Sequence, residues 1–244
     1  MADGRRMAMA AFETVFRPWF RHRVDGVLVR GEGLGVPGQP VLVAANHVSW
    51  WDGFVVREAQ RRLRPGASLV PIMLRRELDR QPVLRGLGVV GLEPGSTGSL
   101  RHALRELDRR LAAEPDSVIL LFPQGRIWPS HRRPLGFRRG LELFARVLDV
   151  PVIPMAIHME PLDAVSPTFF VAAAPALHSP AATRVERSVE RELDAILEFV
   201  AIYGEDAARV WPGPDPDLPV PPELGAGRAP ELRRGRVASS GRAP

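Results

Sequence analysis

The chain has 244 residues, 45% of them hydrophobic, which is enough for one sizeable α/β domain but too few for two full domains. It has no cysteine, which excludes a disulfide framework, thiolate chemistry and a cysteine zinc site, and fits a cytoplasmic protein. All 33 basic residues are arginine, and the net charge of +5 favours acidic partners such as nucleic acid, an anionic lipid surface or a phosphate-bearing cofactor.

Residues 1–26 predict an N-terminal amphipathic helical segment. Its apolar residues at helical spacing are Met7, Ala11, Phe12, Val15, Phe16, Trp19 and Phe20. Pro18 is expected to end or kink this helix. A basic, aromatic segment of this kind can lie in a membrane interface, but the same stripe is typical of a helix packed on its own domain. No apolar run reaches the roughly 18 to 20 residues of a transmembrane helix, and the compact apolar core of a signal peptide is missing.

Apolar runs and helical patterns alternate from residue 27 to residue 211. The expected strands are 27–30, 40–45, 67–73, 88–92, 117–122, 152–157 and 169–173. The expected helices are 52–63, 75–87 with a break before Pro82, a helix from about residue 97 to residue 111, 137–148 and 183–209. This alternation predicts one α/β domain with a mostly parallel or mixed sheet flanked by helices, and a site at the carboxyl ends of its strands.

Two arginine-rich parts of the sequence are not expected to form a specific site. Arg101, Arg105 and Arg109 recur every four residues on one predicted helix, which is typical of a solvated helix face. Residues 212–244 are rich in Pro, Gly and Arg without hydrophobic periodicity, and predict a disordered tail.

A histidine and a carboxylate stand five positions apart just after the apolar run 40–45, in the stretch Asn-His-Val-Ser-Trp-Trp-Asp-Gly at 46–53. His47 is expected at a strand exit, with Ser49 as the N-cap of the next helix and Asp52 in its first turn. Asp52 can then take the proton on one ring nitrogen of His47 and leave the other free to act as a base. The structural alternative is a capped helix with a satisfied histidine.

Three later stretches join this motif in a fixed order. They are Leu-Leu-Phe-Pro-Gln-Gly-Arg at 120–126, Phe-Arg-Arg-Gly at 137–140 and Val-Pro-Val-Ile-Pro-Met-Ala-Ile at 150–157. Together, over roughly residues 27–160, the four blocks resemble the motifs of the glycerolipid acyltransferases, the lysophospholipid and glycerol-3-phosphate acyltransferase family. Four ordered blocks are far more specific than any one of them.

The resemblance implies an O-acyltransferase of lipid metabolism. His47, oriented by Asp52, would serve as general base in moving a fatty acyl group from acyl-CoA or acyl-carrier protein to a hydroxyl of a lipid or glycolipid. No acyl-enzyme is needed, so Ser49 is expected to cap the helix rather than act as nucleophile. No cofactor beyond the acyl donor is implied, and no metal site is expected because further ligands are missing at regular spacing. Many members of the family act at membranes, which implies a cytoplasmic protein peripheral to the inner face of the cell membrane.

The chain departs from the family pattern where an anion would bind. Gln124-Gly125-Arg126-Ile127 stands in place of Glu-Gly-Thr-Arg, and Glu93-Pro94 stands where many relatives carry a phosphate-binding arginine. These changes favour an acceptor without a phosphate, with 1-acylglycerol-3-phosphate acyltransferase of phospholipid biosynthesis as the alternative. The expected substrate-binding residues are Gln124, Gly125, Arg126, Arg138 and Arg139, within an arginine-rich stretch that could hold the diphosphate of CoA, an acidic carrier protein or lipid headgroups, or could be an exposed loop without a ligand.

A second class of function remains open from the residues alone. A non-catalytic basic protein could bind membrane or nucleic acid through its arginines, with His47 and Asp52 serving only as structure. The ordered motifs favour the enzyme. Nucleic acid is disfavoured because the aromatic residues lie in the amphipathic segment and beside His47 rather than on a basic strand platform.

Overall fold

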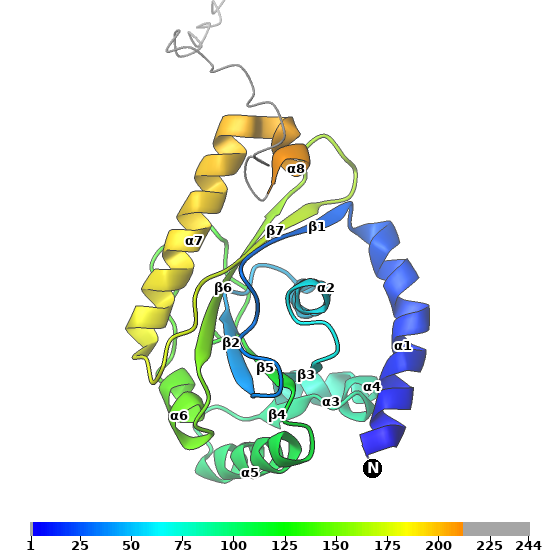
Figure 1. The fold of residues 1–244 in the computed structure, drawn as a ribbon, viewed down its shortest axis with the longest axis vertical. Helices are drawn as coiled ribbons and strands as arrows, with labels where there is room; N and C mark the ends of the chain where they lie inside the picture. Colours follow the sequence, from blue (N-terminus) through cyan, green and yellow to red (C-terminus); the bar gives the residue numbers. More distant parts are fainter. Residues whose placement is uncertain (1, 212–244) are drawn as a thin grey trace, which may run out of the picture. The chain divides into compact units, whose positions relative to one another are not determined.

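The computed structural model describes the backbone of residues 2–211 and the side chains of residues 11–81 and 84–211. Its core is a seven-stranded sheet with the order β1-β7-β6-β2-β5-β3-β4 (Figure 1). All neighbouring strands are parallel except β6 and β7, which are antiparallel. The strands are β1 (Gly26–Arg30), β2 (Val41–Ala45), β3 (Ser68–Leu74), β4 (Val90–Leu92), β5 (Ser117–Leu121), β6 (Val152–Glu160) and β7 (Thr168–Ala173). The predicted α/β fold with a mostly parallel sheet is confirmed.

Helices cover both faces of this sheet, so its central strands are apolar on both sides. Alternate residues of β2 illustrate the division: Leu42 and Ala44 join the cluster of α5, α6 and α7, whereas Val41 and Val43 join the cluster of α1 and α2. Figure 1 shows α2 between the sheet and α1, with α5, α6 and α7 around the opposite side. The helices are α1 (Ala2–Arg23), α2 (Asp52–Leu63), α3 (Arg75–Arg80), α4 (Pro82–Gly86), α5 (Thr97–Ala113), α6 (Gly140–Val147), α7 (Ala182–Tyr203) and α8 (Ala207–Val210), with a 3-10 turn at Gly204–Asp206.

Two helix predictions need comment. Pro18, expected to end or kink α1, does not end it: the helix continues to Arg23, and Phe16 and Phe20 on either side of the proline pack against α2. The predicted helix 183–209 stops at Tyr203 instead, since Gly204 takes a positive φ of 54° that ends the helix before a short turn and α8. The tail prediction for 212–244 lies outside the described residues.

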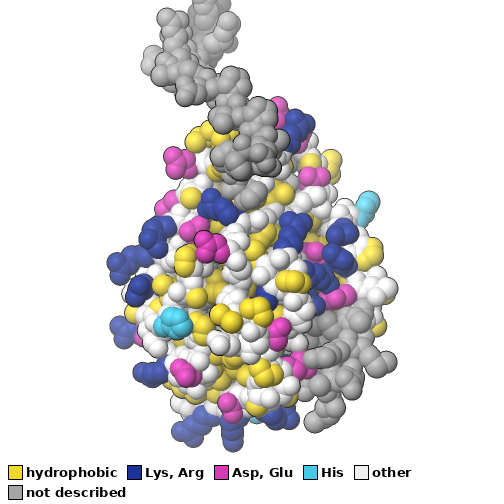
Figure 2. Space-filling model, in the orientation of Figure 1, with side chains coloured by type: hydrophobic (Ala, Val, Ile, Leu, Met, Phe, Trp, Pro, Cys, Tyr) yellow, Lys and Arg dark blue, Asp and Glu magenta, His cyan; other side chains and the backbone are white. Residues whose placement is uncertain are grey.

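The arginine row of α5 is exposed, as predicted. Figure 2 shows basic side chains gathered along the lower edge of the molecule, over α5. Among residues 2–211, no helix is long and apolar enough to cross a membrane.

Candidate active site

His47 and Asp52 face each other at the carboxyl end of β2. His47 follows the strand, and Asp52 is the first residue of α2. The Nδ1 atom of His47 lies 2.7 Å from Oδ2 of Asp52. No other described residue hydrogen-bonds the His47 ring, whose side chain is 23% exposed. Asp52 can therefore accept a hydrogen bond from Nδ1–H and leave Nε2 as an accessible base.

Asp52 is held rigidly by its neighbours. Its buried carboxylate accepts hydrogen bonds from the backbone N–H groups of Val48 at 2.6 Å and Ser49 at 3.0 Å, and from the Ser49 hydroxyl at 2.6 Å. The sequence predicted Ser49 as the N-cap of α2, but Trp51 has that position. The reason is that the reciprocal Ser49–Asp52 bonding closes a turn just before the helix, in which the Ser49 hydroxyl accepts from the backbone N–H of Trp51. These bonds fix the carboxylate that orients His47.

The loop after β5 contacts the backbone and one ring face of His47. The backbone N–H of His47 donates to Oε1 of Gln124 at 2.7 Å, and its carbonyl accepts from the backbone N–H of Trp128 at 2.7 Å. The imidazole stacks on the Phe122 ring, with centroids 4.4 Å apart. The motif at 46–53 and the motif at 120–126 thus meet in space, because β2 and β5 are neighbouring parallel strands.

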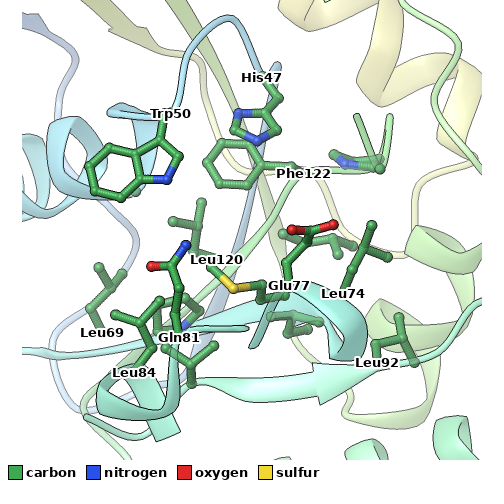
Figure 3. Close-up of a pocket in the computed structure, with 18 of the residues that line it drawn as sticks. His47, Trp50, Leu69, Leu74, Glu77, Gln81, Leu84, Leu92, Leu120 and Phe122 are labelled. Carbon is green, nitrogen blue, oxygen red and sulfur yellow. The ribbon is translucent and has the colours of Figure 1, made fainter. Parts of the chain in front are cut away.

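A cavity of about 910 Å³ begins at His47 and extends beneath β3 and β4. In Figure 3, His47 and Phe122 lie at one end, and leucines from β3, β4, β5 and α4 lie beyond them. The volume is in the range of ligand-binding cavities, and most of the lining is apolar. Apolar lining residues from these elements include Leu69, Ile72, Leu74, Leu84, Leu92 and Leu120.

The aromatic face of α1 forms another wall of this cavity. Phe16 stacks on Phe54 of α2, with ring centroids 4.0 Å apart. The Arg17 side chain pairs with Glu58 of α2 at 3.0 Å. Burial alone would raise the pKa of Glu58, but the hydrogen bond from Arg17 and the positive charges around it outweigh burial and lower that pKa. Phe12, Phe16 and Phe20 of the predicted stripe therefore line the cavity, whereas Val15 and Trp19 of the same stripe are exposed.

Arg126 reaches the cavity but makes no ion pair with any described carboxylate. Its guanidinium lies 3.9 Å from the centroid of the Trp128 ring, and that of Arg132 lies 4.1 Å from the same ring. Both guanidinium groups are thus within cation–π distance of one indole.

Arg138 also lines the cavity, and its guanidinium lies against Gly125. A Cβ at Gly125 would lie 3.5 Å from the Arg138 guanidinium, and the glycine has a positive φ of 65°. The backbone N–H of Gly125 donates to the Phe122 carbonyl at 3.0 Å, so it is not free to stabilise an oxyanion. Arg139 precedes α6 and is exposed, outside the cavity lining.

Gln124 lies behind the cavity. The side chain is 2% exposed and does not belong to the lining, in contrast to the neighbouring Gly125 and Arg126. The residues expected to bind substrate therefore separate into Gly125, Arg126 and Arg138 at the cavity, Gln124 beneath His47, and Arg139 on the surface.

A second histidine, His158, is buried on strand β6. The Nδ1 atom of His158 is 2.9 Å from the Ser130 hydroxyl, and Nε2 is 3.1 Å from Glu160. Burial lowers the pKa of His158, against an opposing effect of Glu160 and a smaller lowering by His131. Sequence reasoning did not single out this cluster, because its members have no recognisable spacing.

Sequence reasoning also missed the cavity. Its wall combines α1, α3, α4 and three strands, so only the folded chain brings these residues together. The sequence offers one signal, the apolar residues of the short helix α4, whereas five of the six residues of α3 are charged. Within the described part of the chain, no cluster of three or more acidic or histidine side chains could hold a metal ion.

Comparisons with known proteins identify the family and a similar fold. A family model described as Acyltransferase matches residues 26–158, more than half of the chain. A search of curated proteins finds no match. Among solved structures, the chain is similar to the 1-acyl-sn-glycerophosphate (LPA) acyltransferase PlsC from Thermotoga maritima, with a TM-score of 0.57, 18% identity, and coverage of 79% of this chain and 81% of that one. That likeness concerns the fold, whereas the family follows from the matched model: the chain belongs to the acyltransferase family.

Proposed function

We propose that this protein transfers a fatty acyl group from a thioester, acyl-CoA or acyl-carrier protein, to a hydroxyl of a lipid or glycolipid. The observation that carries this proposal is a histidine, oriented by a buried carboxylate, at the end of a large apolar cavity. A base beside a long apolar cavity suits a substrate that has a reactive carbonyl at the end of a hydrocarbon chain.

In the proposed reaction, Nε2 of His47 removes the proton of the acceptor hydroxyl as the oxygen attacks the thioester carbonyl. The tetrahedral intermediate collapses with loss of the C–S bond, and the imidazolium returns its proton to the departing thiolate. Asp52 stabilises the imidazolium and keeps the ring in the required tautomer. General-base catalysis of this kind contributes about 10²–10⁴-fold.

The apolar cavity is the proposed site of the acyl chain. Each methylene that leaves water for an apolar wall contributes roughly 0.8 kcal/mol, so a long chain gains most from this cavity. The thioester would then lie beside His47, with the hydrocarbon pointing toward β3, β4 and α4.

The membrane is the proposed source of the acceptor. Trp19 of α1 and Trp50 are 41% and 51% exposed, and both rings pack against Trp51. The Arg23 guanidinium lies 5.5 Å from the Trp19 ring centroid. Exposed indoles beside arginine are typical of a surface at the headgroup level of a bilayer, and Trp50 also lines the cavity.

The acceptor is proposed to lack a phosphate next to its reacting hydroxyl. Glu93, which follows β4 at the rim of the cavity, would repel a phosphate there. One observation favours the alternative, 1-acylglycerol 3-phosphate: Arg126 and Arg138 reach the cavity without a carboxylate partner among the described residues.

A competition assay separates these acceptors. Purified protein would receive one long-chain acyl-CoA together with lysophosphatidic acid, a monoacylglycerol and a glycolipid at equal concentrations, and the products would be identified by mass spectrometry. We expect the neutral hydroxyl lipids to be acylated first. Preferential acylation of lysophosphatidic acid would contradict the proposal of a neutral acceptor. If the wild type prefers neutral lipids, a Glu93→Gln variant that gains activity toward lysophosphatidic acid would show that the Glu93 carboxylate causes the selectivity against phosphate.

A further inference from the structure

Both backbone polar groups of His47, its N–H and its carbonyl, are bound by one segment, residues 122–128. The Gln124 side chain accepts from the His47 N–H, and the Trp128 N–H donates to the His47 carbonyl, each at 2.7 Å. The Phe122 ring supports one face of the imidazole. Of these contacts, only the first depends on a polar side chain.

Gln124 has no route to a substrate in this arrangement. It is 2% exposed, and its Oε1 is already the acceptor for His47. Its Nε2 is buried and has no hydrogen-bond partner among the described residues. An amide that recognised a substrate hydroxyl would present a polar atom to the cavity, yet Gln124 does not line it.

We infer that Gln124 is a positioning residue, which fixes the main chain of His47 by accepting a hydrogen bond from its N–H, and not a substrate-binding residue. This inference rests on the proposed function. If the buried His47 N–H loses its acceptor, the backbone moves toward another partner, and the imidazole of the same residue moves with it. Nε2 would then leave the line between the hydroxyl proton and Asp52, although the substrates bind as before.

A glutamate could make the same bond. One carboxyl oxygen would accept from the His47 N–H in either protonation state, and the resembled motif carries glutamate at this position. The property required at residue 124 is therefore an acceptor at the end of a two-methylene side chain, rather than the donor that the amide also supplies.

The test compares three variants. Gln124→Met keeps the length of the side chain and removes the acceptor, whereas Gln124→Glu keeps the acceptor. Gln60→Met is the matched control, because Gln60 is fully buried and bonds the carbonyls of Arg64 and Ala67 at the far end of α2. Two properties would be measured for each: hydrogen exchange of the His47 amide by NMR, and kcat and KM for acyl transfer.

Gln124→Met is expected to speed exchange of the His47 amide at least tenfold and to lower kcat by roughly 10- to 100-fold with KM nearly unchanged. Gln124→Glu should restore the protection of that amide, and Gln60→Met should leave both the amide and kcat as in the wild type. Protection and kcat that persist in Gln124→Met would overturn the inference, as would a rise in KM alone, which indicates substrate binding. Loss of protection in a protein whose wild type transfers no acyl group would support the positioning role and refute the proposed function.

Discussion

At the scale of single residues, the site depends on the tautomer of one histidine. Asp52 is fully buried, and its position is fixed by donors from Val48 and Ser49. A carboxylate that only accepts hydrogen bonds forces the proton of His47 onto Nδ1. The same place filled by an amide could donate to Nδ1, and Nε2 would then carry the proton and could not act as a base.

Asp52→Asn should therefore lower kcat by about 10³–10⁴-fold while the protein stays folded. Turnover and circular dichroism would be measured together. Glu192→Gln is a suitable control, since that carboxylate pairs with Arg30 on the edge strand β1, three strands away from β2. An Asp52→Asn enzyme with near-normal kcat would show that the carboxylate does not control the tautomer.

His158 gives the stability a pH dependence of predictable sign. Burial lowers the pKa of this histidine in the folded protein, so the unfolded chain takes up its proton at a higher pH, near 6.5. The contribution of neutral His158 is complete above that value and is lost as the pH falls through it. Urea unfolding should give a lower free energy of unfolding at pH 5.5 than at pH 7.5, by at most about 1.4 kcal/mol per pH unit for this one proton.

A pair of histidine variants assigns that loss. His158→Gln should remove part of the difference between the two pH values, whereas His178→Gln, at an exposed position, should leave it unchanged. An equal pH dependence in the wild type and in His158→Gln would contradict the assignment.

At the scale of elements, the short helix α4 contributes Leu84 to the wall of the cavity. Leu84 lies across the cavity from His47 in Figure 3. Leu84→Trp should shorten the space for hydrocarbon, lowering kcat/KM for a long-chain acyl-CoA by tenfold or more and changing that for a short-chain donor by less than twofold. A series of donors of increasing length would measure this, with Ile202→Trp as a control on the exposed end of α7. An equal loss for all chain lengths would argue against an acyl chain in this cavity.

Most elements could be predicted because their local patterns agree with their burial. The apolar run at β5 is buried at every position, and the leucines of α5 recur at helical spacing against the sheet. The start of α2 at residue 52 was predicted correctly, but its N-cap was not, because the Ser49–Asp52 bonding that the sequence indicates closes a turn before the helix. Pro18 does not end α1, since side-chain packing on α2 outweighs the local preference of proline.

At the scale of the whole molecule, sheet topology decides what the site contains. Neighbouring parallel strands bring residues 47 and 124 together although they are far apart in the sequence. Predicting the convergence of two strand exits required only the α/β alternation. The role of Gln124 and the existence of the cavity could not be predicted, because both depend on side chains from elements that meet only in the folded chain.

The most direct measurement is thiol release from a long-chain acyl-CoA in the presence of lipid hydroxyl acceptors, with wild-type protein and His47→Ala. The account predicts acceptor-dependent release by the wild type and a loss of about 10²–10⁴-fold in His47→Ala, with an unchanged circular dichroism spectrum. A His47→Ala protein that releases thiol at nearly the wild-type rate would contradict the central claim that His47 is the general base for acyl transfer.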